Sequence, residues 1–149
     1  MRTNDTNKKI MGFTLIELVV VVAIAFFILS LVFVLMRDAK TRSRDARREE
    51  DVKQIQNSLG VYQINRRQFP SCSLGVINGA SDCLSQALFD EGAVGAVAID
   101  PLGGGSGTCL AGGSYVYCYE SGGLDYTLHY NLETDSIPGK SAGWQQVKP

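Results

Sequence analysis

The feature that most constrains the fold of this chain is the uninterrupted apolar run at residues 13–36. These 24 residues contain no Pro or Gly and one charged residue, Glu17. A helix crosses a bilayer with about 20 apolar residues, so the run is long enough to span a membrane. A carboxylate at the centre of a membrane costs roughly 2.5–3.5 kcal/mol on insertion scales. We therefore expect Glu17 to have a function.

A short basic segment, with Lys8 and Lys9, precedes the run, and the junction reads GFTLIEL from Gly12 onward. An ordinary secretory signal has its cleavage site after the apolar core, whereas here the glycine comes before it. This junction resembles the processing site of type IV pilins and of the related pseudopilins of type II secretion. An alternative is a single-pass anchor in which the glycine occurs by chance.

The resemblance implies a specific maturation pathway. A prepilin peptidase removes residues 1–12 by cutting between Gly12 and Phe13, and the new terminus at Phe13 is methylated. Residues 13–36 then form the transmembrane and fibre-core helix. Glu17 lies one helical turn from the new amine, and the resemblance implies that it pairs with that amine on the adjacent subunit.

Charge divides the rest of the chain into a basic stem and an acidic head. Residues 37–67 hold nine Lys/Arg and five Asp/Glu, a net charge of +4, whereas residues 70–149 have a net charge of −6. The basic residues after the run compete with the leader cations under the positive-inside rule, so composition alone leaves the orientation open. The resemblance places the precursor in the inner membrane, with the head outside the cytoplasm. It places the assembled fibre in the periplasm or outside the cell.

Residues 13–67 contain no proline, which predicts one helix about 80 Å long. Val52, Ile55, Leu59 and Tyr62 recur at steps of 3, 4 and 3, which predicts an apolar packing face in the stem at residues 37–67. Pro70 should end the helix near Arg66 or Arg67.

The stretch at residues 41–51, TRSRDARREED, has no packing face of its own. Two interpretations stay open: a charged helix surface in solvent, or an inter-subunit ion-pair belt in a fibre.

The sequence at residues 68–149 predicts a small β-rich head. Residues 114–120 and 125–133 alternate in polarity and are rich in aromatics, as strands are, and residues 121–124 form the turn between them. Tyr126, Leu128, Tyr130 and Leu132 should face the apolar stripe of the helix. We expect a short helix at residues 81–88, a further strand near residues 143–147, and a flexible connection at residues 103–107. The predicted fold is α+β: a long N-terminal helix packed against a small antiparallel sheet, as in pilins.

Four cysteines allow three disulfide pairings, and an extracytoplasmic head permits disulfides. We favour the local pairs Cys72–Cys83 and Cys109–Cys118. If Gly113 and Ser114 form a two-residue hairpin turn, residues 109 and 118 lie directly opposite each other. Closing that loop contributes about 2.7 kcal/mol in the chain-entropy estimate. A reduced, metal-binding set of cysteines is the alternative.

Candidate chemistry in the head is sparse. His129 should be exposed or lightly packed, because the sequence offers it no recognisable nucleophile. Asp125, Glu133 and Asp135 offer oxygens to calcium, which some pseudopilins bind in this late loop, but they lack the ligand spacing of an EF-hand. We therefore expect no enzyme activity and no cofactor, with calcium as a weaker alternative.

We thus expect a structural subunit, a pilin or major-type pseudopilin, that polymerises into a type IV pilus or pseudopilus. The implied partners are further copies of the chain, the prepilin peptidase, the inner-membrane assembly platform and minor pilins.

Three different functions compete with this interpretation. The first is a minor pilin that binds DNA or a surface through Arg66 and Arg67. The −6 head argues against nucleic acid, because nonspecific DNA affinity depends on neutralising phosphates. The second is a secretion pseudopilus component that pushes substrate through the outer membrane. The third is an anchored periplasmic enzyme.

Overall fold

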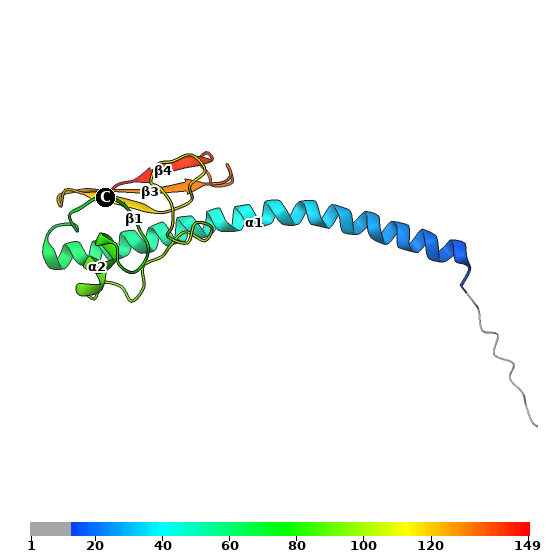
Figure 1. Ribbon diagram of the computed structural model, residues 1–149, viewed down its shortest axis with the longest axis horizontal. Coiled ribbons are helices and arrows are strands. Elements are labelled where there is room, and N and C mark those ends of the chain that lie inside the picture. Colours follow the sequence, from blue (N-terminus) through cyan, green and yellow to red (C-terminus); the bar gives the residue numbers. More distant parts are fainter. Residues whose placement is uncertain (1–12) are drawn as a thin grey trace, which may run out of the picture. The chain divides into compact units, whose positions relative to one another are not determined.

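A computed structural model describes residues 13–149, except for the side chains of residues 33–35 and 37. The expected cleavage site after Gly12 and the leader before it lie outside the described residues. The elements, in order, are helix α1 (Leu15–Arg66), strand β1 (Cys72–Val76), helix α2 (Cys83–Asp90) and strands β2 (Cys118–Ser121), β3 (Tyr126–Leu132) and β4 (Gly143–Val147) (Figure 1). The chain divides into two units between Asp38 and Ala39, and we describe each by itself.

The described part of the N-terminal unit is the first portion of α1. Its segment Leu15–Val32 has a mean hydropathy of 3.0, and none of it is buried within the protein. Its length and composition are sufficient to cross a membrane. This finding agrees with the expected apolar helix.

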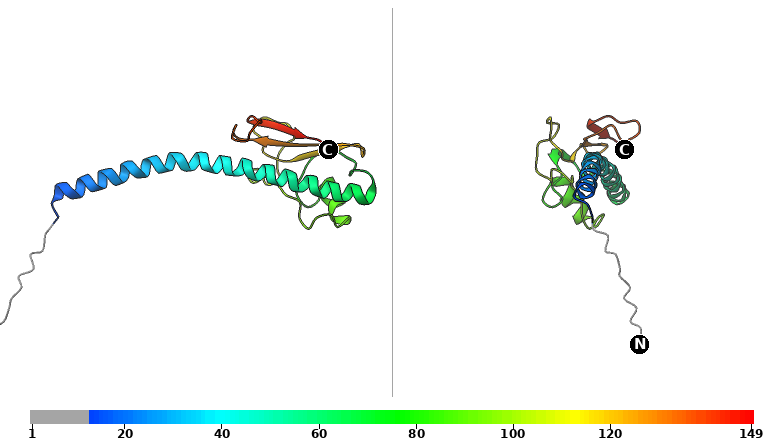
Figure 2. Two further views of the ribbon diagram at one scale, coloured as in Figure 1. Left: turned by 180° about the vertical axis from the view of Figure 1, so that it is seen from behind. Right: turned by 90° about the vertical axis from the view of Figure 1, so that its right-hand side faces the viewer.

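The C-terminal unit is a four-stranded antiparallel sheet, in the order β1-β2-β3-β4, that covers the C-terminal part of α1. The sheet and α2 lie on different sides of this part of the helix (Figure 2). The predicted stripe is confirmed, since Val52, Ile55 and Leu59 are at most 2% exposed. The β3 residues predicted to face the helix belong to the same hydrophobic core as this stripe: Tyr126, Leu128, Tyr130 and Leu132. The chain therefore has the expected α+β fold, a long helix followed by a small antiparallel sheet.

The ends of the helices follow local rules. Helix α1 ends at Arg66, and Arg67 has a φ of 59°, so the chain turns just before Pro70, which cannot continue a helix. Asp82 caps α2 by accepting a hydrogen bond from the Ser85 backbone N–H at 2.9 Å. A side-chain oxygen at this position satisfies one of the unpaired donors at a helix N-terminus.

The sheet differs from the prediction at its first strand. Residues 109–117 are not a strand, so the predicted hairpin around Gly113 and Ser114 is wrong. The neighbour of β2 is instead β1, with Cys72 opposite Ser121 and Val76 opposite Cys118. The sequence CSLGV is short and contains a glycine, so its strand is fixed by pairing with β2 rather than by its own pattern.

The glycine-rich segment at residues 103–107 is closely packed in part, contrary to the expected flexible connection. A Cβ on Gly103 would lie 1.8 Å from the Tyr115 carbonyl oxygen. No side chain fits there without moving the backbone, because real Cβ contacts do not approach this distance. The glycine is therefore required by a close approach between two chain segments.

Truncating the centre of the stripe tests the packing of the helix on the sheet. Leu59→Ala should lower the free energy of unfolding by about 2–5 kcal/mol, because Leu59 is fully buried and its loss leaves a cavity. The matched control is Ile64→Ala, since Ile64 is 80% exposed and its loss should change stability by less than about 0.5 kcal/mol. Urea unfolding of the full chain in mild detergent, followed by the fluorescence of the single tryptophan, Trp144, measures both. Equal effects of the two variants would contradict the assigned packing face.

Candidate functional site

A buried ion cluster joins α1 to the head, and Arg48 is its centre. The Arg48 side chain is fully buried. Its Nε donates to Asp100 at 2.7 Å, and its Nη1 donates to both Asp45 and Glu133 at 2.7 Å. The Arg48 guanidinium also lies 4.9 Å from the centre of the Tyr115 ring, close enough for a cation–π contact.

The carboxylates of the cluster also hold backbone groups. Asp45 accepts hydrogen bonds from the backbone N–H groups of Glu133 and Thr134, each at 2.9 Å. Asp100 accepts from the N–H groups of Leu102 and Gly103 at 2.8 and 3.1 Å. One cluster thus fixes both the loop that follows β3 and the turn that begins at Asp100.

The electrostatics of the cluster keep its charges paired. Burial opposes the charge on Arg48, but hydrogen bonds to Asp100, Glu133 and Asp45 outweigh it and raise the Arg48 pKa. A hydrogen bond from Arg44 lowers the Glu133 pKa, with Arg48 adding to the effect. Removing one member of such a buried set leaves uncompensated charge, which costs more than the intact set contributes.

This cluster corrects the expectation for residues 41–51. The sequence pattern suggests solvated charges or an inter-subunit belt, but Asp45 and Arg48 are 0% exposed and are paired within the chain. A signal for this is present in the sequence. Arg48 and Asp45 extend the stripe backward from Val52 by steps of 4 and 3, so they lie on the packed face of the helix.

Three further hydrogen bonds tie the helix to the head beyond the cluster. Tyr117 donates from its hydroxyl to Asp51 at 2.9 Å. The Lys140 ammonium donates to Glu49 at 2.7 Å, and the Tyr130 hydroxyl donates to the same carboxylate at 2.6 Å. Burial raises the Tyr130 pKa to about 12, and burial also raises the pKa of Tyr117. These hydroxyls therefore stay protonated as donors to the helix carboxylates.

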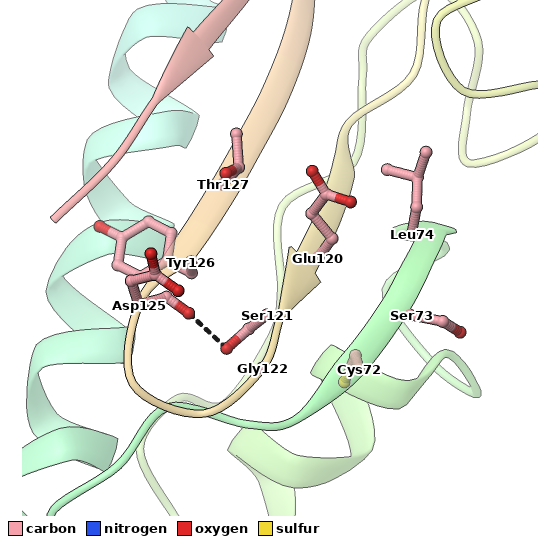
Figure 3. Close-up of a pocket in the computed structure, with 9 residues that line it drawn as sticks. All are labelled: Cys72, Ser73, Leu74, Glu120, Ser121, Gly122, Asp125, Tyr126 and Thr127. Carbon is pink, nitrogen blue, oxygen red and sulfur yellow. Dashed lines mark hydrogen bonds between the residues drawn. The ribbon is translucent and has the colours of Figure 1, made fainter.

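A polar pocket of about 270 Å³ lies on the head where β1, β2 and the β2–β3 loop meet (Figure 3). Glu120 on β2 and Thr127 on β3 lie opposite each other in the sheet. The Ser121 hydroxyl donates to the Asp125 backbone carbonyl at 2.6 Å. The pocket is lined by Cys72, Ser73, Leu74, Glu120, Ser121, Gly122, Asp125, Tyr126 and Thr127. It offers mainly hydrogen-bond acceptors and hydroxyls.

His129 differs from its prediction, because it is only 8% exposed. It packs beside Glu120, with 3.4 Å between its Nε2 and the carboxylate. In the register of the sheet it lies opposite Cys118 and Gln146. The residue therefore belongs to a covered part of the sheet, which its place in the strand alternation did not reveal.

The three acids considered for calcium are not gathered at one point. Asp125 and Glu133 flank opposite ends of the seven-residue strand β3, which places them roughly 26 Å apart at about 3.3 Å per residue. Glu133 binds Arg44 and Arg48, while Asp135 accepts from the Ala142 backbone N–H at 2.6 Å. Among the described residues, no group of three or more acids, histidines or cysteines is arranged to hold a metal.

Both predicted disulfides are present, Cys72–Cys83 and Cys109–Cys118. The first ties β1 to α2. The second ties residue 109 to β2, and two further contacts hold the same loop to the sheet. The side chains of Asn131 and Trp144 donate to the carbonyls of Ser114 and Ala111 at 2.8 and 3.0 Å. The disulfide therefore fastens a loop over the sheet rather than cross-linking the predicted hairpin.

Two of the predicted assembly residues, Phe13 and Glu17, lie at the start of the described part of the N-terminal unit. Phe13 is 76% exposed, and Glu17 is exposed in the first turn of α1. The Glu17 backbone N–H donates to the Thr14 hydroxyl oxygen at 3.3 Å. The Glu17 carboxylate is thus presented on an apolar helix surface that the rest of the described chain leaves uncovered.

Replacing the central cation tests the cluster. Arg48→Met should lower the free energy of unfolding by about 3–5 kcal/mol, because it leaves buried carboxylates without their cation. The matched control is Arg47→Met, since the Arg47 side chain is 68% exposed and 3.9 Å from Asp51, and such surface pairs contribute at most about 1 kcal/mol. Thermal unfolding of the two full-length variants compares them. An Arg48 variant as stable as the Arg47 variant would show that the cluster does not hold the head together.

We compared the chain with protein-family models, with curated proteins and with solved structures, and none of these comparisons gives a match. The architecture itself is compatible with pilins, because an apolar N-terminal helix precedes a small antiparallel sheet.

Proposed function

We propose that the chain is a structural subunit, a pilin or major-type pseudopilin, that polymerises into a type IV pilus or pseudopilus. The observation that carries this proposal is the segment Leu15–Val32, which is long enough to span a membrane and contains no buried residue. It overlaps the GFTLIEL junction, which begins at Gly12 and ends at Leu18. Such a surface needs lipid or further helices around it.

The proposed mechanism is non-catalytic. The apolar helices leave the bilayer and bundle at the centre of the fibre, with the heads outward. Lipid gives apolar helices little hydrophobic reason to associate, so packing and polar contacts must select their register. Glu17 supplies such a contact by pairing with the amine that processing creates at Phe13 of the adjacent subunit.

Cross-links within the head are consistent with this structural role. Two disulfides and the Arg48 cluster hold its segments to one another and to α1. A small head with a limited core gains stability from such constraints. In this proposal the partners are further copies of the chain, the prepilin peptidase, the assembly platform and minor pilins.

A DNA-binding minor pilin has less support. Arg66, one of the two cations considered for DNA, donates to Glu91 at 2.5 Å. The net charge of −6 over residues 70–149 also repels phosphates.

Processing gives the first test of the proposal. Coexpression with a prepilin peptidase should convert the chain to a form that begins at Phe13 and carries one methyl group on its amine. Intact-mass measurement of fibre-derived protein detects both changes. Fibres built from a chain that still begins at Met1 would contradict the pilin assignment.

Glu17→Leu gives the second test. Removing the Glu17 carboxylate should ease membrane insertion, by at most the roughly 2.5–3.5 kcal/mol that a carboxylate costs at the membrane centre. In the fibre, however, the Phe13 ammonium would lose its partner at a cost of roughly 3–5 kcal/mol. We therefore expect normal accumulation and cleavage but few or no fibres, as judged by membrane immunoblotting and electron microscopy of sheared material.

The matched control for this experiment is Glu50→Leu, which removes an exposed carboxylate from the stem and should leave fibres abundant. Abundant fibres from the Glu17 variant would show that its carboxylate does not set the register.

A further inference from the structure

Two cations that closely follow the apolar run have no ion pair with any residue that the structure describes. Lys40 and Arg42 are exposed, and none of the ion pairs of the described residues includes them. Two of the cations that follow are engaged, because Arg44 binds Glu133 and Arg48 is buried among carboxylates. Lys53 and Arg67 are also exposed and outside these ion pairs, but Lys40 and Arg42 are the exposed cations of the described stem that lie closest to the apolar run.

The spacing along α1 places these two cations at the depth of lipid headgroups. They follow Met36, the last residue of the apolar run, by four and six residues, or about 6 and 9 Å of helix. The headgroup layer extends roughly 5–7 Å beyond the hydrocarbon on each side. Helical side chains lean toward the N-terminus, which here is toward the membrane, and Lys and Arg stems extend along apolar surface to place their charge at its edge.

The angular positions of the two residues favour lipid over a protein partner. Residues two apart on a helix do not share a face, so Lys40 and Arg42 project from nearly opposite sides of α1. A protein docked on one side would contact one of them. Headgroups surround a single span on all sides and reach both.

We propose that Lys40 and Arg42 bind the anionic headgroups of phospholipids in the leaflet on the head side of the membrane. This inference takes its membrane orientation from the proposed function. A basic residue near an anionic surface strengthens association by about fivefold, so the two together strengthen it by about 25-fold. The contact stabilises the membrane-resident subunit and is lost when the subunit enters a fibre.

The test uses the full-length chain in nanodiscs that contain phosphatidylcholine and phosphatidylglycerol, with a photoreactive headgroup on one lipid at a time. Mass spectrometry maps the cross-links, and the readout is the ratio of phosphatidylglycerol to phosphatidylcholine labelling at residues 36–44. Mapping by position separates this segment from the basic leader. The variant is Lys40→Gln with Arg42→Gln. The matched control is Lys53→Gln with Arg67→Gln, which removes one exposed Lys and one exposed Arg farther along the chain.

The expected result is a phosphatidylglycerol preference in the wild type that falls by up to about 25-fold in the Lys40/Arg42 variant. It should persist in the control variant and disappear in 1 M salt, where the Debye length is about 3 Å. An equal labelling ratio in the wild type and the Lys40/Arg42 variant, or an equal loss in both variants, overturns the proposal. A wild-type chain that forms fibres but shows no lipid preference would overturn this inference alone. A lipid preference in a chain that never enters fibres would overturn the proposed function alone.

Discussion

The buried guanidinium of Arg48 is the constraint on which the arrangement of the head depends. It joins carboxylates from three places in the chain: Asp45 on the helix, Asp100 in the turn before β2, and Glu133 after β3. A buried ion pair is weak evidence for net stability, because desolvation offsets its attraction. The buried ion pairs act more strongly on the positions of the loops than on net stability, since a misplaced loop would leave a charge buried without a partner. The cluster therefore specifies where the loops lie on α1.

The sequence predicts the parts of this fold that depend on local periodicity. The helix and its Val52–Ile55–Leu59 stripe follow a repeat of 3.6 residues, and the structure confirms them. The β3 face predicted to pack on the helix is also buried, but the opposite face, with His129 and Asn131, is covered as well, which the two-residue repeat does not predict. The helical repeat places Asp45 and Arg48 on the packed face, but it does not predict that Arg48 pairs with Asp100, which lies 52 residues away. No local pattern encodes a pairing over that separation. The same reason explains β1, which becomes a strand only because β2 pairs with it.

The second disulfide shows how a correct pairing can follow from an incorrect local structure. The prediction matches Cys109 to Cys118 through a hairpin turn at Gly113 and Ser114, but residues 109–117 form a loop over the sheet. The bond forms there because the loop returns residue 109 to β2, with Cα atoms 5.9 Å apart. A separation of nine residues is short enough that loop closure favours the pair in either geometry. The prediction of this disulfide is therefore supported by the low entropic cost of closing a short loop and not by the hairpin register.

The way in which the stem pairs its charges limits how heads could contact one another in the proposed fibre. An inter-subunit belt built on Asp45 and Arg48 is excluded, because both side chains are fully buried and a neighbour cannot reach them. Cations that remain accessible on the stem include Lys40, Arg42, Arg47 and Lys53. Exposed charges set orientation and association rate more than affinity. In the proposed fibre, cohesion would therefore come mainly from the apolar surface of Leu15–Val32, while these cations would restrict which registers are allowed.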